Sequence, residues 1–217
     1  MAVCTPTCIS GINRFVVGPV AQICCCEPHM AKWDSERGKY SSPQKLSGYA
    51  VIFAGSFNPP HAGHAEVISF LAASHKQVHL VIGVNPKKTY PVSGEARKEI
   101  LEHMVQEAGF QNVRVHVWGG YVWKLAAQLG AKRLARGVRS WEEDGKPERY
   151  LQVQNLLWPV LLACLPPIKT TYVEAPPQLR NFSSTLLRQR LERGESIDDM
   201  VPNSIARQVA AAYVGKL

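Results

Sequence analysis

The stretch "FAGSFNPPHAGHAEV", residues 53–67, decides how the chain folds. It places two glycines, two prolines and two histidines between an apolar run and a run with helical character. Glycine tolerates backbone conformations that other residues avoid, and proline restricts the chain, so such clusters mark a turn. The pattern therefore predicts a strand that ends near Gly55, a tight turn, and a helix that begins near His61.

The alternation of a short apolar run with a helix-length segment repeats along the chain from Tyr49 onward. The predicted strands cover residues 49–55, 77–84, 112–118, 131–137 and 168–175. The predicted helices cover residues 61–74, 94–108, 121–129, 146–164, 184–193 and 202–214. Consecutive parallel strands need long crossover connections, which helices supply. The sequence therefore predicts an α/β fold with a doubly wound parallel sheet in one domain, residues 48–217.

Residues 1–47 have a different character. Five of the six cysteines lie within the first 26 residues, no periodicity is sustained, and the segment ends in the linker-like "GKYSSPQKLSG". We expect residues 1–47 to be a flexible extension or a targeting segment. The run Cys24–Cys26 lacks the paired spacing of a zinc site, so we expect no metal there. We expect a cytoplasmic protein, with a plastid or mitochondrion as alternatives because of this segment.

Composition limits the class of partner. A hydrophobic content of 46% is ordinary for a globular protein, and no apolar run reaches the roughly 18 residues of a membrane span, so we expect no membrane insertion. The formal charge of +8 favours an anionic partner. Basic side chains follow the predicted strand ends and form no stripe interleaved with aromatic residues. We therefore expect a phosphorylated small molecule and no nucleic acid.

Polar and basic residues follow the ends of the predicted strands, where ligands bind in open α/β sheets. They lie in "GSFNPPHAGH" (55–64), "NPKKTYP" (85–91), "RGVRSWEEDGKPE" (136–148) and "QLRNFSSTLLR" (178–188). His61 and His64 share one face at the start of a helix, near backbone N–H groups and the positive end of the dipole. This arrangement predicts an anion site, and we expect Gly55 and Gly63 to leave space for the ligand.

Two of these segments carry a family resemblance. "GSFNPPHAGH" resembles the G-[ST]-F-[DN]-P-x-H-x-G-H signature of the HxGH nucleotidyltransferase superfamily, and "FSSTLLR" (182–188) resembles its second motif. "RGVR" (136–139), "QVQN" (152–155) and "NPKKTYP" are similar to segments of phosphopantetheine adenylyltransferases. The resemblance covers residues 49 to about 214. It implies a Rossmann-like domain that transfers AMP from ATP to 4'-phosphopantetheine, giving dephospho-coenzyme A and pyrophosphate in coenzyme A biosynthesis.

The resemblance also implies roles for individual residues. The implied catalytic residues are His64, Lys88 and Arg139. The implied ATP-binding residues are Gly55, Ser56, His61, His64, Gly137, Arg139, Glu148, Ser183, Ser184, Thr185 and Arg188. The implied acceptor-binding residues are Ser56, Lys88 and Arg136. Because the segment after "RGVR" is about one residue longer than the family pattern, Glu143 or Asp144 is an alternative to Glu148. Mg²⁺ is expected to arrive with ATP, since it prefers phosphate oxygens and water to an all-protein site.

Other functions stay open at this point. The spelling "GSFNP", with Asn58, is also associated with nicotinamide or nicotinate mononucleotide adenylyltransferases of NAD biosynthesis. Cytidylyltransferases of the superfamily and a non-catalytic nucleotide- or nucleic-acid-binding module are further alternatives. A pantetheine acceptor needs an apolar channel, which could be lined by residues 156–158 and Val160, although a helix core explains these residues equally well. No feature of the sequence indicates an oligomeric state.

Overall fold

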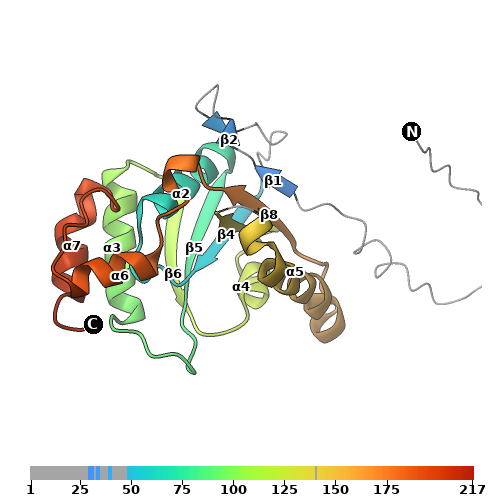
Figure 1. Cartoon of the computed structure of the whole chain (residues 1–217). Coiled ribbons are helices and arrows are strands. Elements are labelled where there is room, and N and C mark those ends of the chain that lie inside the picture. Colours follow the sequence, from blue (N-terminus) through green and yellow to red (C-terminus); the bar gives the residue numbers. More distant parts are fainter. Residues whose placement is uncertain (1–28, 32, 35–38, 41–47, 140) are drawn as a thin grey trace, which may run out of the picture.

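The computed structural model describes residues 29–31, 33–34, 39–40, 48–139 and 141–217 (Figure 1). Side chains are described for residues 48–139, 149 and 152–217. One sheet contains β1 (His29–Ala31), β4 (Ala50–Gly55), β5 (Gln77–Gly83), β6 (Val113–Trp118), β7 (Arg133–Val138) and β8 (Lys169–Glu174). The short strands β2 (Trp33–Asp34) and β3 (Lys39–Tyr40) pair antiparallel apart from that sheet.

The sheet is parallel throughout, with the strand order β1-β8-β7-β4-β5-β6. The helices are α2 (Ala62–Ser74), α3 (Gly94–Glu107), α4 (Val122–Gln128), α5 (Trp141–Ala163), α6 (Ser184–Glu192) and α7 (Asn203–Tyr213), with a 3-10 turn at Pro177–Leu179. The prediction of an α/β fold with a doubly wound parallel sheet is confirmed.

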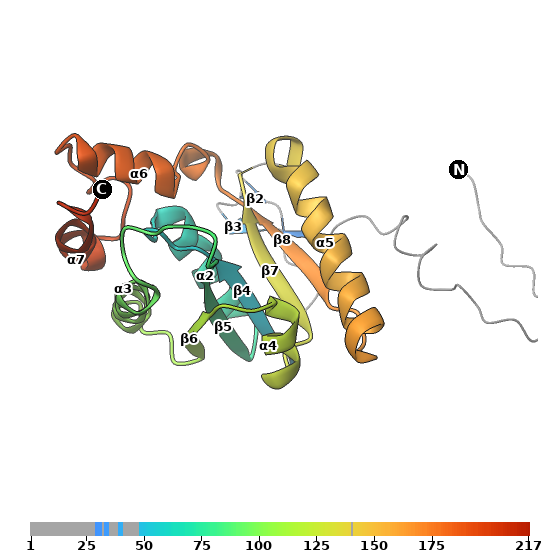
Figure 2. The ribbon, with the colours of Figure 1, turned by 90° about the horizontal axis from the view of Figure 1, so that it is seen from below.

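Helices cover both faces of the sheet (Figure 2). On one face, α2, α3, α6 and α7 pack on alternate residues of β4 and β5, such as Val51, Phe53 and Leu80. On the other face, α4 and α5 pack on the intervening residues, such as Ile52 and Val81. Strands that are apolar on both sides belong to a sheet buried between two layers, which explains the continuous apolar run of β4.

The strand order places a ligand crevice at β4. From β4 the chain proceeds outward to β5 and β6, and it then crosses to β7 on the other side of β4. Helices that start on either side of such a reversal diverge, so a crevice opens beyond the carboxyl ends of the two central strands. The turn after β4 and the "RGVR" segment at the end of β7 therefore meet at this crevice.

One helix begins earlier than expected. The predicted range was 146–164, but α5 begins at Trp141, so Gly145 and Pro147 lie inside it. Glycine disfavours a helix interior, and Gly145 lies directly before the predicted start at residue 146. Contacts of α5 with α4, β7 and β8 accompany the continuous helix, and tertiary packing of this kind overrides local propensity.

Part of the N-terminal segment joins the sheet. β1 pairs with β8, with His29 opposite Thr171 and Ala31 opposite Val173. The three residues of β1 lie within the range 1–47, which was expected to be an extension apart from the domain. Their pairing covers the edge of β8 that would otherwise be open. The cysteines of this segment lie outside the described residues. No helix in the part of the chain that the structure describes is long and apolar enough to cross a membrane.

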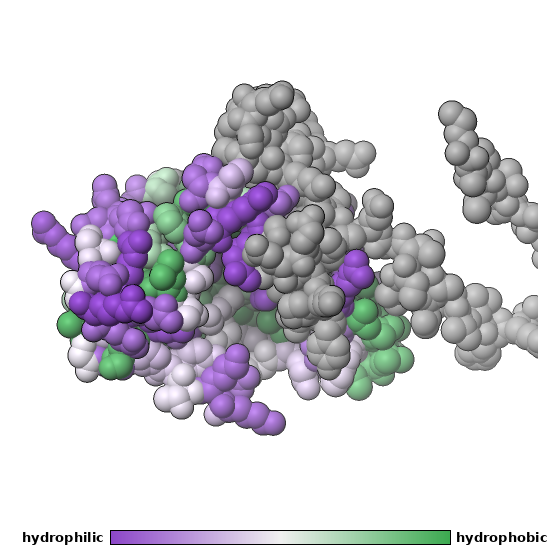
Figure 3. Space-filling view, viewed as in Figure 1, coloured by the Kyte–Doolittle hydropathy of each residue, from purple (hydrophilic) through white to green (hydrophobic). Residues whose placement is uncertain are grey.

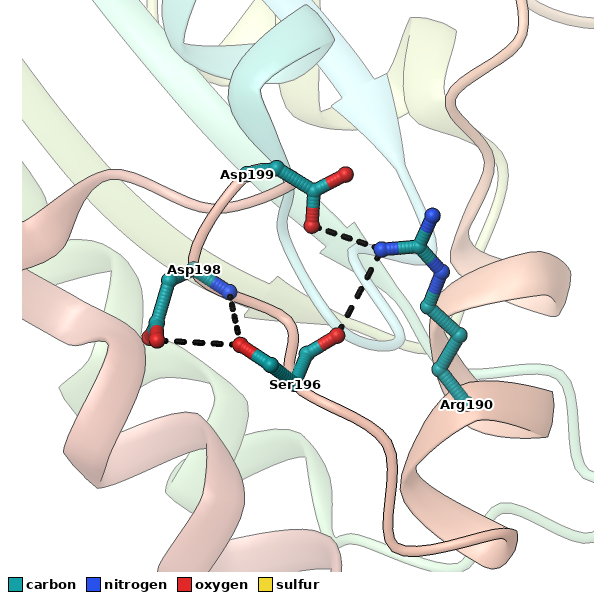
Figure 4. A network of polar contacts seen from close by, with 4 residues as sticks. All are labelled: Arg190, Ser196, Asp198 and Asp199. Carbon is teal, nitrogen blue, oxygen red and sulfur yellow. Dashed lines mark hydrogen bonds and ion pairs between the residues drawn. The ribbon is translucent and has the colours of Figure 1, made fainter.

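The outer surface is mostly hydrophilic on the face that Figure 3 shows, and apolar side chains gather at the end of α5. At the other end of the molecule, polar contacts fix the link between α6 and α7 (Figure 4). Arg190 on α6 donates to Asp199 Oδ1 at 2.6 Å, and Ser196 Oγ donates to Asp198 Oδ2 at 2.9 Å. This link holds α7 in place beside α6.

Helix α7 reaches the turn after β4 through one buried hydrogen bond, which gives a stability prediction. The Tyr213 hydroxyl donates to Asn58 Oδ1 at 2.7 Å. The substitution Tyr213→Phe leaves this buried oxygen without a partner, and we expect it to lower the free energy of unfolding by about 1–3 kcal/mol. Urea denaturation followed by circular dichroism measures the change. Tyr49→Phe, at a side chain that is 48% exposed, is the control, and equal stability of the two variants would contradict the prediction.

Candidate active site

A cavity of about 310 Å³ lies beyond the carboxyl ends of β4, β7 and β8. Its wall brings together nine residues predicted from the sequence: Gly55, Ser56, His61, His64, Arg136, Gly137, Arg139, Ser183 and Ser184. They come from the turn after β4, the start of α2, the end of β7 and the start of α6. The two histidines of the first motif and the two serines of the second therefore border one shared space.

The two histidines cap α2 and fix each other's orientation. His61 Nδ1 accepts a hydrogen bond from Gly63 N at 3.1 Å, and His64 Nδ1 accepts one from His61 N at 3.2 Å. The ring centroids lie 3.8 Å apart with the ring planes tilted by 40°, and the centroid of the His64 ring also lies 4.9 Å from that of the Phe57 ring. Because both Nδ1 atoms act as acceptors, the proton of each neutral ring resides on Nε2. Each imidazole thus keeps one N–H donor for a ligand.

Burial keeps both rings neutral at physiological pH. It lowers the pKa of His61 from its usual value of 6.5 to about 4. Burial also lowers the pKa of His64 well below its usual value, with further contributions from the charges of His61 and Arg136. The pair therefore presents hydrogen-bond donors without a permanent charge, and a bound phosphate would raise both pKa values.

The first-turn N–H groups of α2 have partners within the protein. Ala62 N donates to Met200 O at 2.8 Å, and Gly63 N donates to His61. These two N–H groups are therefore engaged within the protein, and the anion site at the start of α2 stays a prediction. For the N–H groups of Ser184 and Thr185 on α6, no partner occurs among the described residues, as is usual at helix starts.

The glycines of the first motif make room for protein side chains. A Cβ on Gly55 would lie 3.2 Å from the Phe57 ring, and a Cβ on Gly63 would lie 3.0 Å from Cε1 of His61. Such distances are too short for an unstrained contact. Both glycines line the cavity, and an added side chain at either position would meet the ring of Phe57 or His61; that the glycines leave space for a ligand stays a prediction.

The turn after β4 is held from several sides. Phe57 has a φ of +45° and is fully buried, so this turn is costly unless its surroundings enforce it. Carbonyl oxygens at the end of β4 and in the turn accept hydrogen bonds from side chains of three other elements: Ala54 from Arg136 on β7 (3.0 Å), Ser56 from Arg97 on α3, Asn58 from Arg188 on α6, and Pro59 from Ser184 on α6 (2.8 Å). Two side chains of the second motif, Ser184 and Arg188, thus contact the loop of the first motif directly.

Three other predicted residues, Lys88, Thr185 and Arg188, do not line this cavity. Lys88 is exposed in the loop after β5, and Thr185 is exposed on α6. Arg188 donates to the Asn58 carbonyl and, at 3.4 Å, to the Thr185 hydroxyl. Glu148 lies on α5, and its side chain, like those of Glu143 and Asp144, lies outside the described residues.

The sequence analysis missed Arg97, which is fully buried on α3. A signal was present in the helical pattern. The buried residues of α3 are Arg97, Ile100, Leu101, Met104 and Val105, which follow the spacing of a core-facing helix stripe. A charged residue at the first position of such a stripe needs buried hydrogen-bond partners, and here one of them is the carbonyl of Ser56.

A second cavity, of about 200 Å³, adjoins the first and shares Ala54 and Arg136 with it. Its wall is rich in polar side chains: Gln152, Gln154, Asn155, Tyr121, Tyr172 and Thr170. The Thr170 hydroxyl is buried and has no hydrogen-bond partner among the described residues. Residues 156–158 and Val160, which could line an apolar channel, border neither of these two cavities, so that channel stays a prediction.

Comparisons with known proteins agree with this site. The cytidylyltransferase-like family model matches residues 52–190. A phosphopantetheine adenylyltransferase of Streptococcus agalactiae is 32% identical over 73% of this chain and 94% of its own length. Those of Mesorhizobium japonicum (30% identical, 75% and 96%) and Bifidobacterium longum (28% identical, 75% and 93%) are also similar. A solved structure described as a candidate nicotinate-nucleotide adenylyltransferase, from Vibrio parahaemolyticus, aligns with a TM-score of 0.49 and 16% identity over 74% of this chain and 97% of that chain.

The fold, the shared cavity and the family match define the chain as a nucleotidyltransferase of the cytidylyltransferase-like family. The relatives from Streptococcus and Mesorhizobium are at least 30% identical and are covered almost completely. The chain therefore belongs to the phosphopantetheine adenylyltransferase family, as the resemblance of "RGVR", "QVQN" and "NPKKTYP" predicted.

The low pKa of His61 predicts a pH-dependent stability. Below the unfolded-state pKa of 6.5 the unfolded chain takes up a proton first, so the stability that neutral His61 contributes is present above 6.5 and is lost as the pH falls towards about 4. His61→Asn keeps an oxygen that can cap α2 but does not titrate. Between pH 7 and pH 5, we expect this variant to lose about 1–2 kcal/mol less unfolding free energy than the wild type. Urea denaturation at both pH values tests this, and equal losses would contradict it.

Proposed function

We propose that this enzyme transfers AMP from ATP to 4'-phosphopantetheine, producing dephospho-coenzyme A and pyrophosphate. The observation that carries the proposal is the shared cavity between the imidazoles of α2 and the start of α6, in a chain of this family. Donors converge there from four elements, and the net charge of +8 favours the anionic substrates. The similar curated proteins carry the name of this activity.

We assign the ATP side of the site to the cavity wall. The Nε2–H groups of His61 and His64 donate to the triphosphate, with His64 placed to stabilise the charge that develops during transfer. The start of α6 offers the N–H groups of Ser184 and Thr185 to phosphate oxygens, assisted by the positive end of the helix dipole. Arg139 adds positive charge from the end of β7, and the carboxylate of Glu148 is assigned to the nucleotide by motif matching alone.

We assign the acceptor side to Ser56, Lys88 and Arg136. Ser56 is exposed at the tip of the turn and lines the cavity, so its hydroxyl can orient a phosphate. Arg136 lines both cavities, which places its charge where the acceptor and ATP would meet. The amides of Gln152, Gln154 and Asn155 in the second cavity suit an acceptor arm that itself contains amide groups.

The chemistry requires no protein nucleophile. An oxygen of the acceptor phosphate attacks the α-phosphorus of ATP, the bond to the β-phosphate oxygen breaks, and pyrophosphate leaves. Catalysis then consists of alignment and stabilisation of charge by fixed donors. Two neutral imidazoles whose orientation is locked by the capping box meet this need, because they require no rearrangement as charge develops.

Magnesium is proposed to enter as part of the Mg·ATP substrate. Mg²⁺ prefers phosphate oxygens and water to an all-protein site. Among the residues whose side chains are described, no group of three or more His, Cys, Asp or Glu residues gathers to hold a metal ion.

A pyrophosphate-release assay tests the proposal. With Mg·ATP, we expect turnover with 4'-phosphopantetheine and none with nicotinamide mononucleotide or nicotinate mononucleotide, because the second cavity offers amides for a flexible arm. Mass spectrometry of the product identifies dephospho-coenzyme A. Turnover with a pyridine mononucleotide and none with 4'-phosphopantetheine would place the enzyme in NAD biosynthesis and overturn the assignment.

His64→Ala is expected to lower kcat by about two to three decades, the effect of losing one donor to a developing charge. The helix should persist, since the N-cap bond from Gly63 to His61 does not involve His64. His103→Ala, at a half-buried histidine on α3 that lines neither cavity, is the matched control and should keep wild-type kcat. Steady-state kinetics and near-UV circular dichroism measure both effects. Loss of the native spectrum in His64→Ala would indicate that the ring is needed for folding, and retained kcat would remove it from catalysis.

A further inference from the structure

Arg97 is the largest of the fully buried side chains, and the proposed mechanism gives it no role. Burying a guanidinium is costly unless hydrogen bonds and other favourable contacts offset the loss of water. No ion pair joins Arg97 to a carboxylate among the described side chains, and its Nη2 atom is buried without a hydrogen-bond partner among them. The contacts that Arg97 makes in the core therefore indicate its role.

The contacts of Arg97 point to two loops. Nη1 donates to the carbonyl of Ser56, in the turn after β4. Nε donates to the carbonyl of Ser93 at 3.2 Å, and the guanidinium carbon lies 4.4 Å from the centroid of the Tyr90 ring. Ser93 and Tyr90 belong to the loop between β5 and α3, which also carries Lys88. Arg97 therefore ties the turn of Ser56 to the loop of Lys88.

The loop of Lys88 has further internal order near this contact. Asn85 N donates to the Tyr90 hydroxyl at 3.4 Å, and Lys88 N donates to Asn85 O at 2.9 Å. The stacking of Tyr90 on Arg97 thus anchors the loop at its end nearest α3. Lysine cannot reproduce this arrangement, since it lacks the planar group that donates in two directions while its face rests on an aromatic ring.

The other cations that hold this segment come from α6 and β7. Arg188 reaches the carbonyl of Asn58 from α6, and Arg136 reaches the carbonyl of Ala54 from β7. Arg97 is the one arginine among these three that comes from α3, behind the loop of Lys88. The two loops that it joins carry Ser56 and Lys88, which are both assigned to the acceptor phosphate.

We propose that Arg97 is a positioning residue for the acceptor half of the site, which sets the separation of Ser56 and Lys88 without contacting ATP. The inference rests on the proposed function, because it uses the assignment of these two residues to the acceptor. Loss of a residue with a purely structural role would weaken the binding of ATP and of the acceptor alike. Loss of a positioning residue for the acceptor would weaken the binding of the acceptor and leave that of ATP unchanged.

The test varies ATP and acceptor independently for the full chain. In Arg97→Met we expect the KM of the acceptor to rise by about tenfold or more, with the Kd of ATP, measured by calorimetry, within about twofold of wild type. For Arg97→Lys we expect a KM of the acceptor between those of the wild type and Arg97→Met. Lys88→Ala is the benchmark for an acceptor defect, and it should show the same separation of KM and Kd.

Two further variants test the loss of an unrelated arginine and the loss of the Tyr90 stacking alone. Arg190→Met removes an arginine whose ion pair with Asp199 lies outside both cavities (Figure 4), and it should change stability but neither substrate constant. If Arg97→Met does not fold, Tyr90→Leu removes the stacking while the bond to Ser56 stays, and it should raise the KM of the acceptor by about threefold or more.

Equal changes in both substrate constants, or no change in either, would overturn the inference. The outcome is separable from that of the proposed function. If the wild type transfers AMP to a pyridine mononucleotide instead, the proposed acceptor is wrong, and the same comparison with that acceptor still tests Arg97.

Discussion

The carbonyl groups of the turn after β4 impose the constraint on which the site depends. This turn departs from regular structure so abruptly that its carbonyls cannot join a ladder or a helix, yet several of its residues are buried. Buried carbonyl groups need partners, and here side chains of β7, α3 and α6 provide them. The shape of this turn therefore depends on elements from distant parts of the chain that pack around it.

The same constraint explains the charge arrangement. Three arginines donate to carbonyl oxygens of this segment: Arg136 to Ala54, Arg97 to Ser56 and Arg188 to Asn58. Of the three, Arg136 lines the cavity. The charge of Arg136 also lowers the pKa of His64, after the larger effects of burial and of His61. In the proposed mechanism, the neutral imidazoles donate to the phosphates, while Arg136 and Arg139 add positive charge at the cavity wall.

Much of the fold could be predicted because the chain alternates short apolar runs with helical segments in a regular order. β5, for example, begins at the predicted residue 77, and α6 at the predicted residue 184. The start of α5 was missed because Gly145 and Pro147 indicate a break that tertiary contacts override. β1 was missed because three residues without periodicity become a strand only beside β8. The parallel topology predicts that the motif residues gather at one edge of the sheet. It does not predict which atoms lie beside the glycines, because only the packed structure shows the Phe57 and His61 rings there.

The two cavities meet at Arg136, and this geometry divides the work of the site. Gly55, both histidines and α6 border one cavity alone, and the amides of α5 border the other alone. Only Ala54 and Arg136 border both, and the Arg136 side chain is itself held to the Ala54 carbonyl. An acceptor whose arm fills the second cavity would thus bring its phosphate to the one cation that also faces the nucleotide. Attack on the α-phosphorus brings two anions side by side, and their repulsion would be greatest at this position. Arg136, which borders both cavities, is the cation placed to offset that repulsion.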